Sequence, residues 1–196
     1  MDLNKPIQNL EDAKNFYCFM GCNPFHMSRE YPERYKEFEA LNISKETKAE
    51  WQKEKMQQIF KLAVKNRRKD NSLLLEAYFE FSDNFTPDDV KRVYHLLKAS
   101  YRHSSPLHNV VVAETICNTR GAFPLGCLSL TRKFKMRGWF ERYHRLVKKM
   151  LVFACERDGS LLERSKRALS PKQNGTAELV KEIKEHLDAL EMKYSE

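Results

Sequence analysis

Residues 139–157 read WFERYHRLVKKMLVFACER, a run in which apolar and basic side chains recur with helical spacing. At about 100° per residue, the apolar positions fall on one side of a helix and the basic positions fall on the other. The apolar positions are Phe140, Tyr143, Val147, Met150, Leu151 and Ala154. The basic positions are Arg142, Arg145, Lys148 and Lys149. The pattern predicts a helix that buries one face and presents a row of cations on the other.

Helix signals recur along the rest of the chain. The run Thr86-Pro87-Asp88-Asp89 offers a Thr cap, a Pro at the first helical position and acids beside the positive end of the helix dipole. Six Gly and seven Pro are few for 196 residues, while the helix formers Leu, Lys, Glu, Arg and Met are plentiful. The sequence therefore predicts an all-α protein. Its predicted helices span residues 8–20, 32–40, 45–68, 72–82, 87–103, 106–119, 124–136, 139–157, 160–169 and 176–194.

Pairs of predicted helices begin near residues 72, 106 and 139, at intervals of 33–34 residues. This interval is typical of helical solenoid repeats, although the three units share few residue identities. Two architectures remain open: a compact multi-helix bundle, or a short solenoid-like stack of antiparallel helical hairpins.

The chain is expected to form a single helical domain over residues 1–196, built from three parts. Residues 1–58 are expected to form a helical cap, because they are highly charged, nearly neutral overall and rich in aromatic side chains. Residues 59–172 are expected to form the core hairpins. Residues 173–196 are expected to form an acidic C-terminal helix.

Positive charge is concentrated in one part of the core. Residues 131–172 carry 13 basic and 4 acidic side chains, net +9, whereas the whole chain has a net charge of +8. Clustered Arg and Lys bind nucleic acid by releasing its counterions, and neighbouring aromatic rings can stack on bases. We therefore predict a non-catalytic protein that contacts nucleic acid or another polyanion. The predicted contact residues are Arg132, Lys133, Lys135, Arg137, Trp139, Arg142, Arg145, Lys148 and Lys149.

Two alternatives compete with this interpretation. The basic face could be solvated or paired internally, since an acidic ribbon on the last predicted helix could cover it. That ribbon consists of Glu178, Glu182, Glu185 and Asp188. The chain could also be a protein-protein interaction module, of the adaptor or immunity type, that binds an acidic protein surface and has no nucleic-acid role.

No catalytic or cofactor motif is apparent. The isolated glycines allow neither a phosphate-binding loop nor a dinucleotide fingerprint, and no nucleophile motif accompanies the histidines. Carboxylates interrupt two apolar runs, at Glu76, Glu80 and Glu114, and pairing with a nearby Arg or Lys explains them without catalysis. An enzyme is therefore not the favoured interpretation, and no catalytic residue or cofactor is predicted.

Cysteine usage bears on metals and on location. Cys18, Cys22 and His26 form a C-x3-C-x3-H run, but Gly21 and Pro24 interrupt the helix and no fourth ligand is nearby, so no metal site is predicted. Five cysteines with no tight framework, and no signal peptide, indicate reduced thiols in the cytoplasm. No apolar run reaches the length of a membrane span, so no membrane partner is expected.

Overall fold

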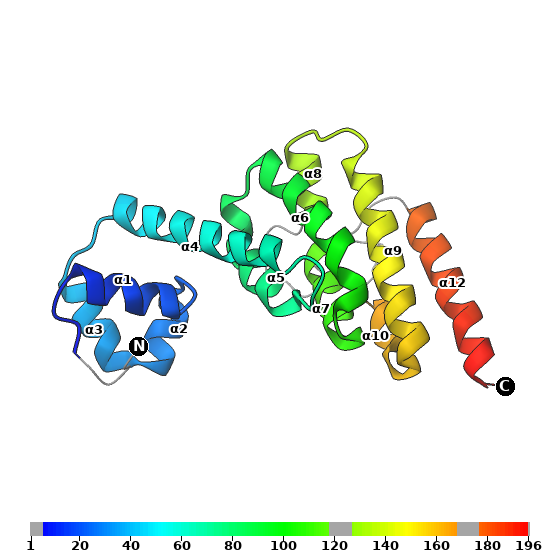
Figure 1. The fold of residues 1–196 in the computed structure, drawn as a ribbon, viewed down its shortest axis with the longest axis horizontal. Helices are drawn as coiled ribbons and strands as arrows, with labels where there is room; N and C mark the ends of the chain where they lie inside the picture. Colours follow the sequence, from blue (N-terminus) through cyan, green and yellow to red (C-terminus); the bar gives the residue numbers. More distant parts are fainter. Residues whose placement is uncertain (1–5, 118–126, 168–176, 196) are drawn as a thin grey trace. The chain divides into compact units, whose positions relative to one another are not determined.

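A computed structural model describes residues 6–117, 127–167 and 177–195 (Figure 1). Within these ranges the regular elements are helices and none is a strand, which confirms the all-α prediction. The chain divides into two compact units, Met1–Ile59 and Phe60–Glu196. The organisation of the chain as a single domain stays a prediction.

The first unit contains α1 (Leu10–Phe19), α2 (Pro24–Glu30), α3 (Pro32–Ala40) and the beginning of α4 (Lys45–Lys65). Its core is aromatic. Phe16 and Phe38 have no exposed surface, and Tyr17 stacks on Phe38 with ring centroids 5.5 Å apart. Trp51 of α4 packs against Tyr17 at 6.1 Å. Rings of this size let a short segment bury a core although its helices are brief.

Helix α2 was not predicted from the sequence. Gly21 and Cys22 adopt left-handed backbone angles, with φ of 65° and 57°, and these angles end the preceding helix. A new helix starts immediately afterwards, because the Asn23 side chain accepts a hydrogen bond from the backbone N–H of Phe25 at 3.0 Å. Pro24 then occupies the first helical turn, where its fixed φ is favourable. The predicted turn at Gly21–Pro24 is therefore also the start of a helix.

The second unit contains the end of α4 and the remaining helices. Its α-helices are α5 (Ser72–Phe79), α6 (Pro87–Ser100), α7 (Pro106–Cys117), α8 (Cys127–Lys133), α9 (Trp139–Arg157), α10 (Leu162–Arg167) and α12 (Ala177–Ser195). Short 3-10 turns lie at η1 (Ser82–Asn84), η2 (Tyr101–His103) and η3 (Gly159–Leu161). Helix α7 packs against both α5 and α9, and α9 packs against α12 (Figure 1). The helices that begin at residues 72, 106 and 139 therefore lie side by side in chain order.

The predicted start of α6 is confirmed by its hydrogen bonds. The Thr86 hydroxyl accepts from the backbone N–H of Asp89 at 3.2 Å, and the Asp89 carboxylate accepts from the backbone N–H of Thr86 at 2.9 Å. This reciprocal pair is a capping box, which satisfies two backbone donors. The buried Asp89 also accepts a hydrogen bond from the Tyr78 hydroxyl at 3.0 Å, so the cap ties α6 to α5.

The predicted apolar face of α9 forms the centre of the second unit. Its five fully buried members are Tyr143, Val147, Met150, Leu151 and Ala154. Phe140, at the edge of this face, is half-buried. Burial of a continuous apolar stripe contributes about 25 cal/mol per Å² of apolar surface and fixes which side of α9 faces water.

Glu114 is paired with an Arg, as predicted, although the partner is not local in the chain as expected. Its carboxylate is 7% exposed and accepts two hydrogen bonds from the Arg164 guanidinium, at 3.0 and 2.8 Å. The contact joins α7 to α10 and raises the pKa of Arg164. Glu80 is exposed, and the side chain of Glu76 lies outside those that the structure describes.

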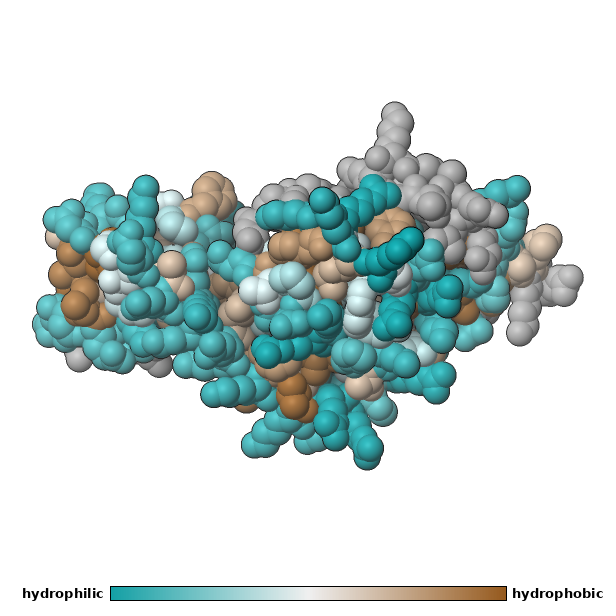
Figure 2. Space-filling model, turned by 90° about the horizontal axis from the view of Figure 1, so that it is seen from above, coloured by the Kyte–Doolittle hydropathy of each residue, from teal (hydrophilic) through white to brown (hydrophobic). Residues whose placement is uncertain are grey.

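On the face drawn in Figure 2, hydrophilic residues cover most of the described surface and hydrophobic residues appear in separate groups. In the described part of the chain, no helix has both the length and the apolar content that a membrane span requires.

Candidate nucleic-acid interface

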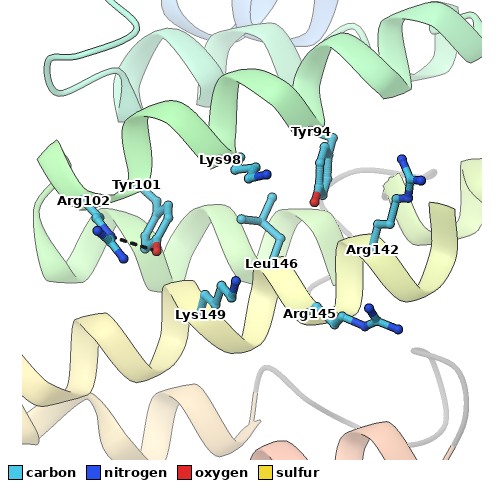
Figure 3. Close-up of a pocket in the computed structure, with 8 residues that line it drawn as sticks. All are labelled: Tyr94, Lys98, Tyr101, Arg102, Arg142, Arg145, Leu146 and Lys149. Atoms are coloured by element: carbon cyan, nitrogen blue, oxygen red, sulfur yellow. Dashed lines mark hydrogen bonds between the residues drawn. The ribbon is translucent and has the colours of Figure 1, made fainter. Parts of the chain in front are cut away.

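A groove of about 510 Å³ lies between α9 and the wall formed by α6 and η2 (Figure 3). Its lining residues are Tyr94, Lys98, Tyr101, Arg102, Arg142, Arg145, Leu146 and Lys149. Five of them are cations, and none of them carries a carboxylate. The groove is therefore a concave site lined mainly by cations, and cations in a cleft reinforce one another.

The α9 wall comes from the predicted basic face. Arg142, Arg145 and Lys149 follow one another at three- and four-residue spacing, and all three are exposed. Lys148 was expected on the same face, but it is half-buried and does not line the groove. The reason is angular, because about 100° per residue places Lys148 next to the fully buried His144.

The opposite wall was not predicted as part of the site. Tyr94, Lys98, Tyr101 and Arg102 recur at i, i+4, i+7 and i+8, so they share one side of α6 and its continuation η2. Figure 3 shows Tyr94, Lys98 and Tyr101 pointing toward α9. The helical recurrence of aromatic and basic residues was a usable signal, although it could not show that this stripe faces α9.

Buried contacts hold the two walls in place. The Tyr143 hydroxyl of α9 donates to the Val90 carbonyl of α6 at 2.5 Å, and Tyr143 is fully buried. On the η2 side, the Tyr101 ring meets Phe153 of α9 edge-on at 5.6 Å. The Asn109 side chain also donates to the Tyr101 carbonyl at 2.8 Å, which anchors η2 to α7. The groove is thus built on rigid elements, so a ligand would meet cations that are already positioned.

Trp139 lies beside the groove but does not line it. Its ring contacts Tyr94 and His95 edge-on, with centroids 5.4 and 6.0 Å apart. The guanidinium of Arg142 lies 4.9 Å from the Trp139 ring centroid, which is a cation–π distance. Trp139 therefore supports a groove cation, whereas the sequence had suggested a ring that stacks on bases.

The other predicted contact residues lie at the end of α8 and on its connection to α9. Arg132, Lys133, Lys135 and Arg137 are exposed, and none of them lines the groove. Arg132 and Lys133 occupy the last turn of α8, where cations favourably meet the helix dipole. The predicted contact residues are therefore divided between the groove and the segment from Arg132 to Arg137.

Few acids compensate the groove cations. Glu141 approaches Arg145 at 3.7 Å, but the two side chains are 62% and 71% exposed. An ion pair this exposed contributes little, because water screens it. Arg145 thus keeps most of its capacity to bind an anion.

Two members of the acidic C-terminal ribbon form ion pairs in the structure. Asp188 pairs with Lys166 of α10 at 2.7 Å, and Glu185 pairs with Lys181 at 3.7 Å. The side chains of Glu178 and Glu182 lie outside those that the structure describes. Helix α12 packs against α9 through its buried residues Ile183 and Leu187. The groove cations of α9 remain exposed beside this packing.

The members of the C-x3-C-x3-H run lie in different elements, with Cys18 in α1, Cys22 in the turn after it and His26 in α2. In the residues that the structure describes, no three His, Cys, Asp or Glu side chains gather as metal ligands. His26 lies in α2, where its ring nitrogen approaches Glu30 at 3.5 Å. None of the five cysteines, all of which lie in the described residues, forms a disulfide.

Comparison with protein-family models, with curated proteins and with solved structures gave no match. Function is therefore inferred from the geometry and charge of the groove.

Proposed function

We propose that this protein binds nucleic acid through the groove between α6–η2 and α9. The observation that carries the proposal is the lining of the groove, where five cations from two walls converge without a carboxylate among them. Three of these cations belong to the basic segment predicted from the sequence. The other two, Lys98 and Arg102, come from outside it and face the same space.

The side-chain chemistry suits a phosphate backbone. An Arg guanidinium can donate two parallel hydrogen bonds to one phosphate, and a Lys ammonium adds a compact charge. Arg142, Arg145 and Arg102 supply the guanidinium groups, and Lys98 and Lys149 supply the ammonium groups. Counterions released by such contacts favour association and make it weaken as salt rises.

The side chains of the groove suit contacts with a nucleic-acid backbone, and none of its lining residues is held in place to hydrogen-bond the edge of a base. Tyr94 and Tyr101 are the aromatic lining residues, and both are engaged in edge-on contacts with rings of α9. Cations on flexible side chains recognise phosphate wherever it occurs, so binding should depend weakly on sequence. A cytoplasmic location, expected from the cysteines of the sequence, is part of this proposal.

The experiment compares two variants that lose the same charge. In the groove variant, Arg142, Arg145 and Lys149 are all changed to Gln. In the control variant, the exposed α4 residues Lys53, Lys61 and Lys65 are changed to Gln. Binding of a fluorescent random-sequence single strand is followed by anisotropy over a range of salt concentrations.

We expect the groove variant to lose at least about ten-fold in affinity at low salt, and the slope of log affinity against log salt to fall by about two for three lost contacts. The control variant should bind nearly as wild type does. Equal losses in both variants would mean that net charge alone governs binding. Absence of binding by wild type at low salt would overturn the proposal, and the groove would then suit an acidic protein surface.

A further inference from the structure

A pair of cysteines lies at the end of α1, in the first unit. Cys18 is in the last turn of the helix, and Cys22 follows four residues later. The backbone N–H of Cys22 donates to the Tyr17 carbonyl at 2.8 Å, and its φ of 57° turns the chain back over the helix end. In this turn the Cys22 side chain forms a hydrogen bond with Cys18.

The two thiols differ in exposure. Cys18 is half-buried and reachable from solvent, whereas Cys22 is 4% exposed. The pair therefore combines an accessible sulfur with a shielded one. An attacking thiol next to a second thiol that can displace its oxidised product is the arrangement found at redox-sensing sites.

The surroundings of Cys18 favour its thiolate. The hydrogen bond that the Cys22 thiol donates is the main reason why the pKa of Cys18 falls to about 7, and Lys55 and Lys14 lower it further. Burial and Glu54 oppose this effect. A thiolate is the nucleophilic form of cysteine, so a substantial fraction of the accessible Cys18 is reactive near neutral pH.

The other three cysteines have the opposite environment. Burial raises the pKa of Cys117 and of Cys127 to about 12. Burial also raises the pKa of Cys155, whose thiol donates to the Ser165 hydroxyl. All three side chains are at most 2% exposed. They therefore serve as internal controls in the same molecule.

We propose that Cys18 and Cys22 form a peroxide-sensitive dithiol, in which Cys18 is oxidised first and Cys22 then closes an intramolecular disulfide. The oxidant is a hydroperoxide, for which hydrogen peroxide is the probe. The site is separate from the groove cations and does not depend on the proposed nucleic-acid function.

Both steps balance. In the first, the Cys18 thiolate attacks one peroxide oxygen, the S–O bond forms and the O–O bond breaks. Hydroxide leaves and becomes water, so the sulfur is oxidised to a sulfenic acid while the peroxide is reduced. In the second, the Cys22 sulfur attacks the Cys18 sulfur, the S–S bond forms and the S–O bond breaks. The departing hydroxide takes the Cys22 thiol proton and leaves as water.

The closure needs a modest adjustment. Residues four apart on a helix have Cβ atoms roughly 5–6 Å apart, whereas a disulfide holds them at roughly 3.5–4.5 Å. Cys22 lies beyond the last residue of α1, Phe19, so it can approach without unwinding the helix interior. Helix ends are also the parts of a helix that open most readily.

The test is peptide mapping of the full-length protein after brief treatment with hydrogen peroxide. The protein is first reduced and freed of metal by a chelator. Trypsin, which cuts after Lys14 and Arg29, releases residues 15–29 with both Cys18 and Cys22 in one peptide. We expect this peptide to lose two hydrogens and to resist maleimide until a reductant is added. Cys117, Cys127 and Cys155 should react at least roughly ten-fold more slowly.

Two variants identify the order of the steps. In Cys22→Ala, Cys18 should accumulate as a sulfenic acid that dimedone traps. In Cys18→Ala, Cys22 should remain a thiol at the same peroxide dose. The proposal is overturned if both cysteines of wild type stay reduced while the buried cysteines oxidise. It is equally overturned if the only disulfides formed are between molecules. The mapping of wild type decides these points even if a variant folds poorly.

Discussion

The guanidinium of Arg142 lies 4.9 Å from the centroid of the Trp139 ring, one helical turn before it on α9. The same ring is held edge-on by Tyr94 of α6 at 5.4 Å. Arg142 is therefore attached, through Trp139, to both walls of the groove. This relationship gives Trp139 a positioning role and leads to a first prediction.

Trp139→Ala should weaken nucleic-acid binding by about 0.5–1 kcal/mol, because Arg142 loses its cation–π support. Trp139→Phe should retain most of the affinity. If Trp139 acts through Arg142, then Trp139→Ala should have little further effect in an Arg142→Gln background. Anisotropy titrations of the four proteins measure this coupling. A full additional loss in the Arg142→Gln background would instead indicate direct stacking on bases.

The α6–η2 wall supplies the second prediction. Lys98→Gln and Arg102→Gln should each lower the slope of log affinity against log salt by about 0.7 for a single strand, the value for one phosphate contact. Lys91→Gln is the matched control, since Lys91 lies on the same helix and pairs with Asp88. If the control lowers the slope as much as Lys98→Gln does, the groove is not the contact surface.

For the ion pair between Glu114 and Arg164, we expect that removing Arg164 alone destabilises the protein more than removing both charges does. Arg164→Met should lower the free energy of unfolding by about 3 kcal/mol, because it removes the guanidinium that donates two hydrogen bonds to the buried Glu114 carboxylate. Adding Glu114→Gln should recover most of the loss. Urea denaturation of the three proteins checks both steps. A loss below about 1 kcal/mol in the single variant would show that water reaches Glu114.

The environment of Cys18 predicts a pH profile. As pH rises through about 7, the folded protein should gain thiolate at Cys18, so its alkylation by iodoacetamide should reach half-maximum there. The charged and titratable groups that face it are Lys14, Lys55, Glu54 and Cys22. In urea the half-maximum should move up toward about 8.5, the ordinary value for cysteine.

Cys22→Ala removes the main cause of the lowered pKa, so the half-maximum for Cys18 should also move upward in the folded variant. Peptide mapping of the alkylated protein separates Cys18 from the buried cysteines. An unchanged profile would show that the lysines alone lower the pKa.

The capping box of α6 predicts a local stability effect. Thr86→Ala should cost about 1 kcal/mol, because the backbone N–H of Asp89 loses its acceptor at the positive end of the helix. Thr86→Ser keeps a hydroxyl and should cost much less. Thermal unfolding measured by circular dichroism compares the two. Similar losses in both would assign the effect to the Thr methyl group.

The helices themselves were largely predictable from the sequence, because their causes are local. The capping residues Thr86–Asp89 determine the start of α6, and the spacing of the apolar residues of α9 determines its buried side. The partner of Glu114 was predictable as a type of residue, since a buried carboxylate needs a cation. Its identity was not, because Arg164 lies 50 residues away in the chain.

Two local features were missed for a different reason. Helix α2 begins only a few residues after α1 ends. The break at Gly21 and Cys22 was therefore interpreted as a turn alone, and Asn23 was not identified as the cap of a new helix. Lys148 was assigned to the basic face by helical spacing, and it lies at the edge of that face next to His144. It is half-buried because His144 is fully buried, which depends on the packing of α9 in the core.

The sequence by itself determined that the chain is helical, where most helices begin, which face of α9 is buried and that positive charge gathers in residues 131–172. These properties depend on neighbours within one or two helical turns. Only the tertiary structure decided that Lys98 and Arg102 stand opposite Arg142, Arg145 and Lys149. That juxtaposition depends on how α6 packs on α9, through contacts such as Tyr143 with Val90, which are 53 residues apart. Such contacts are selected by shape and burial over the whole core, and no local pattern encodes them.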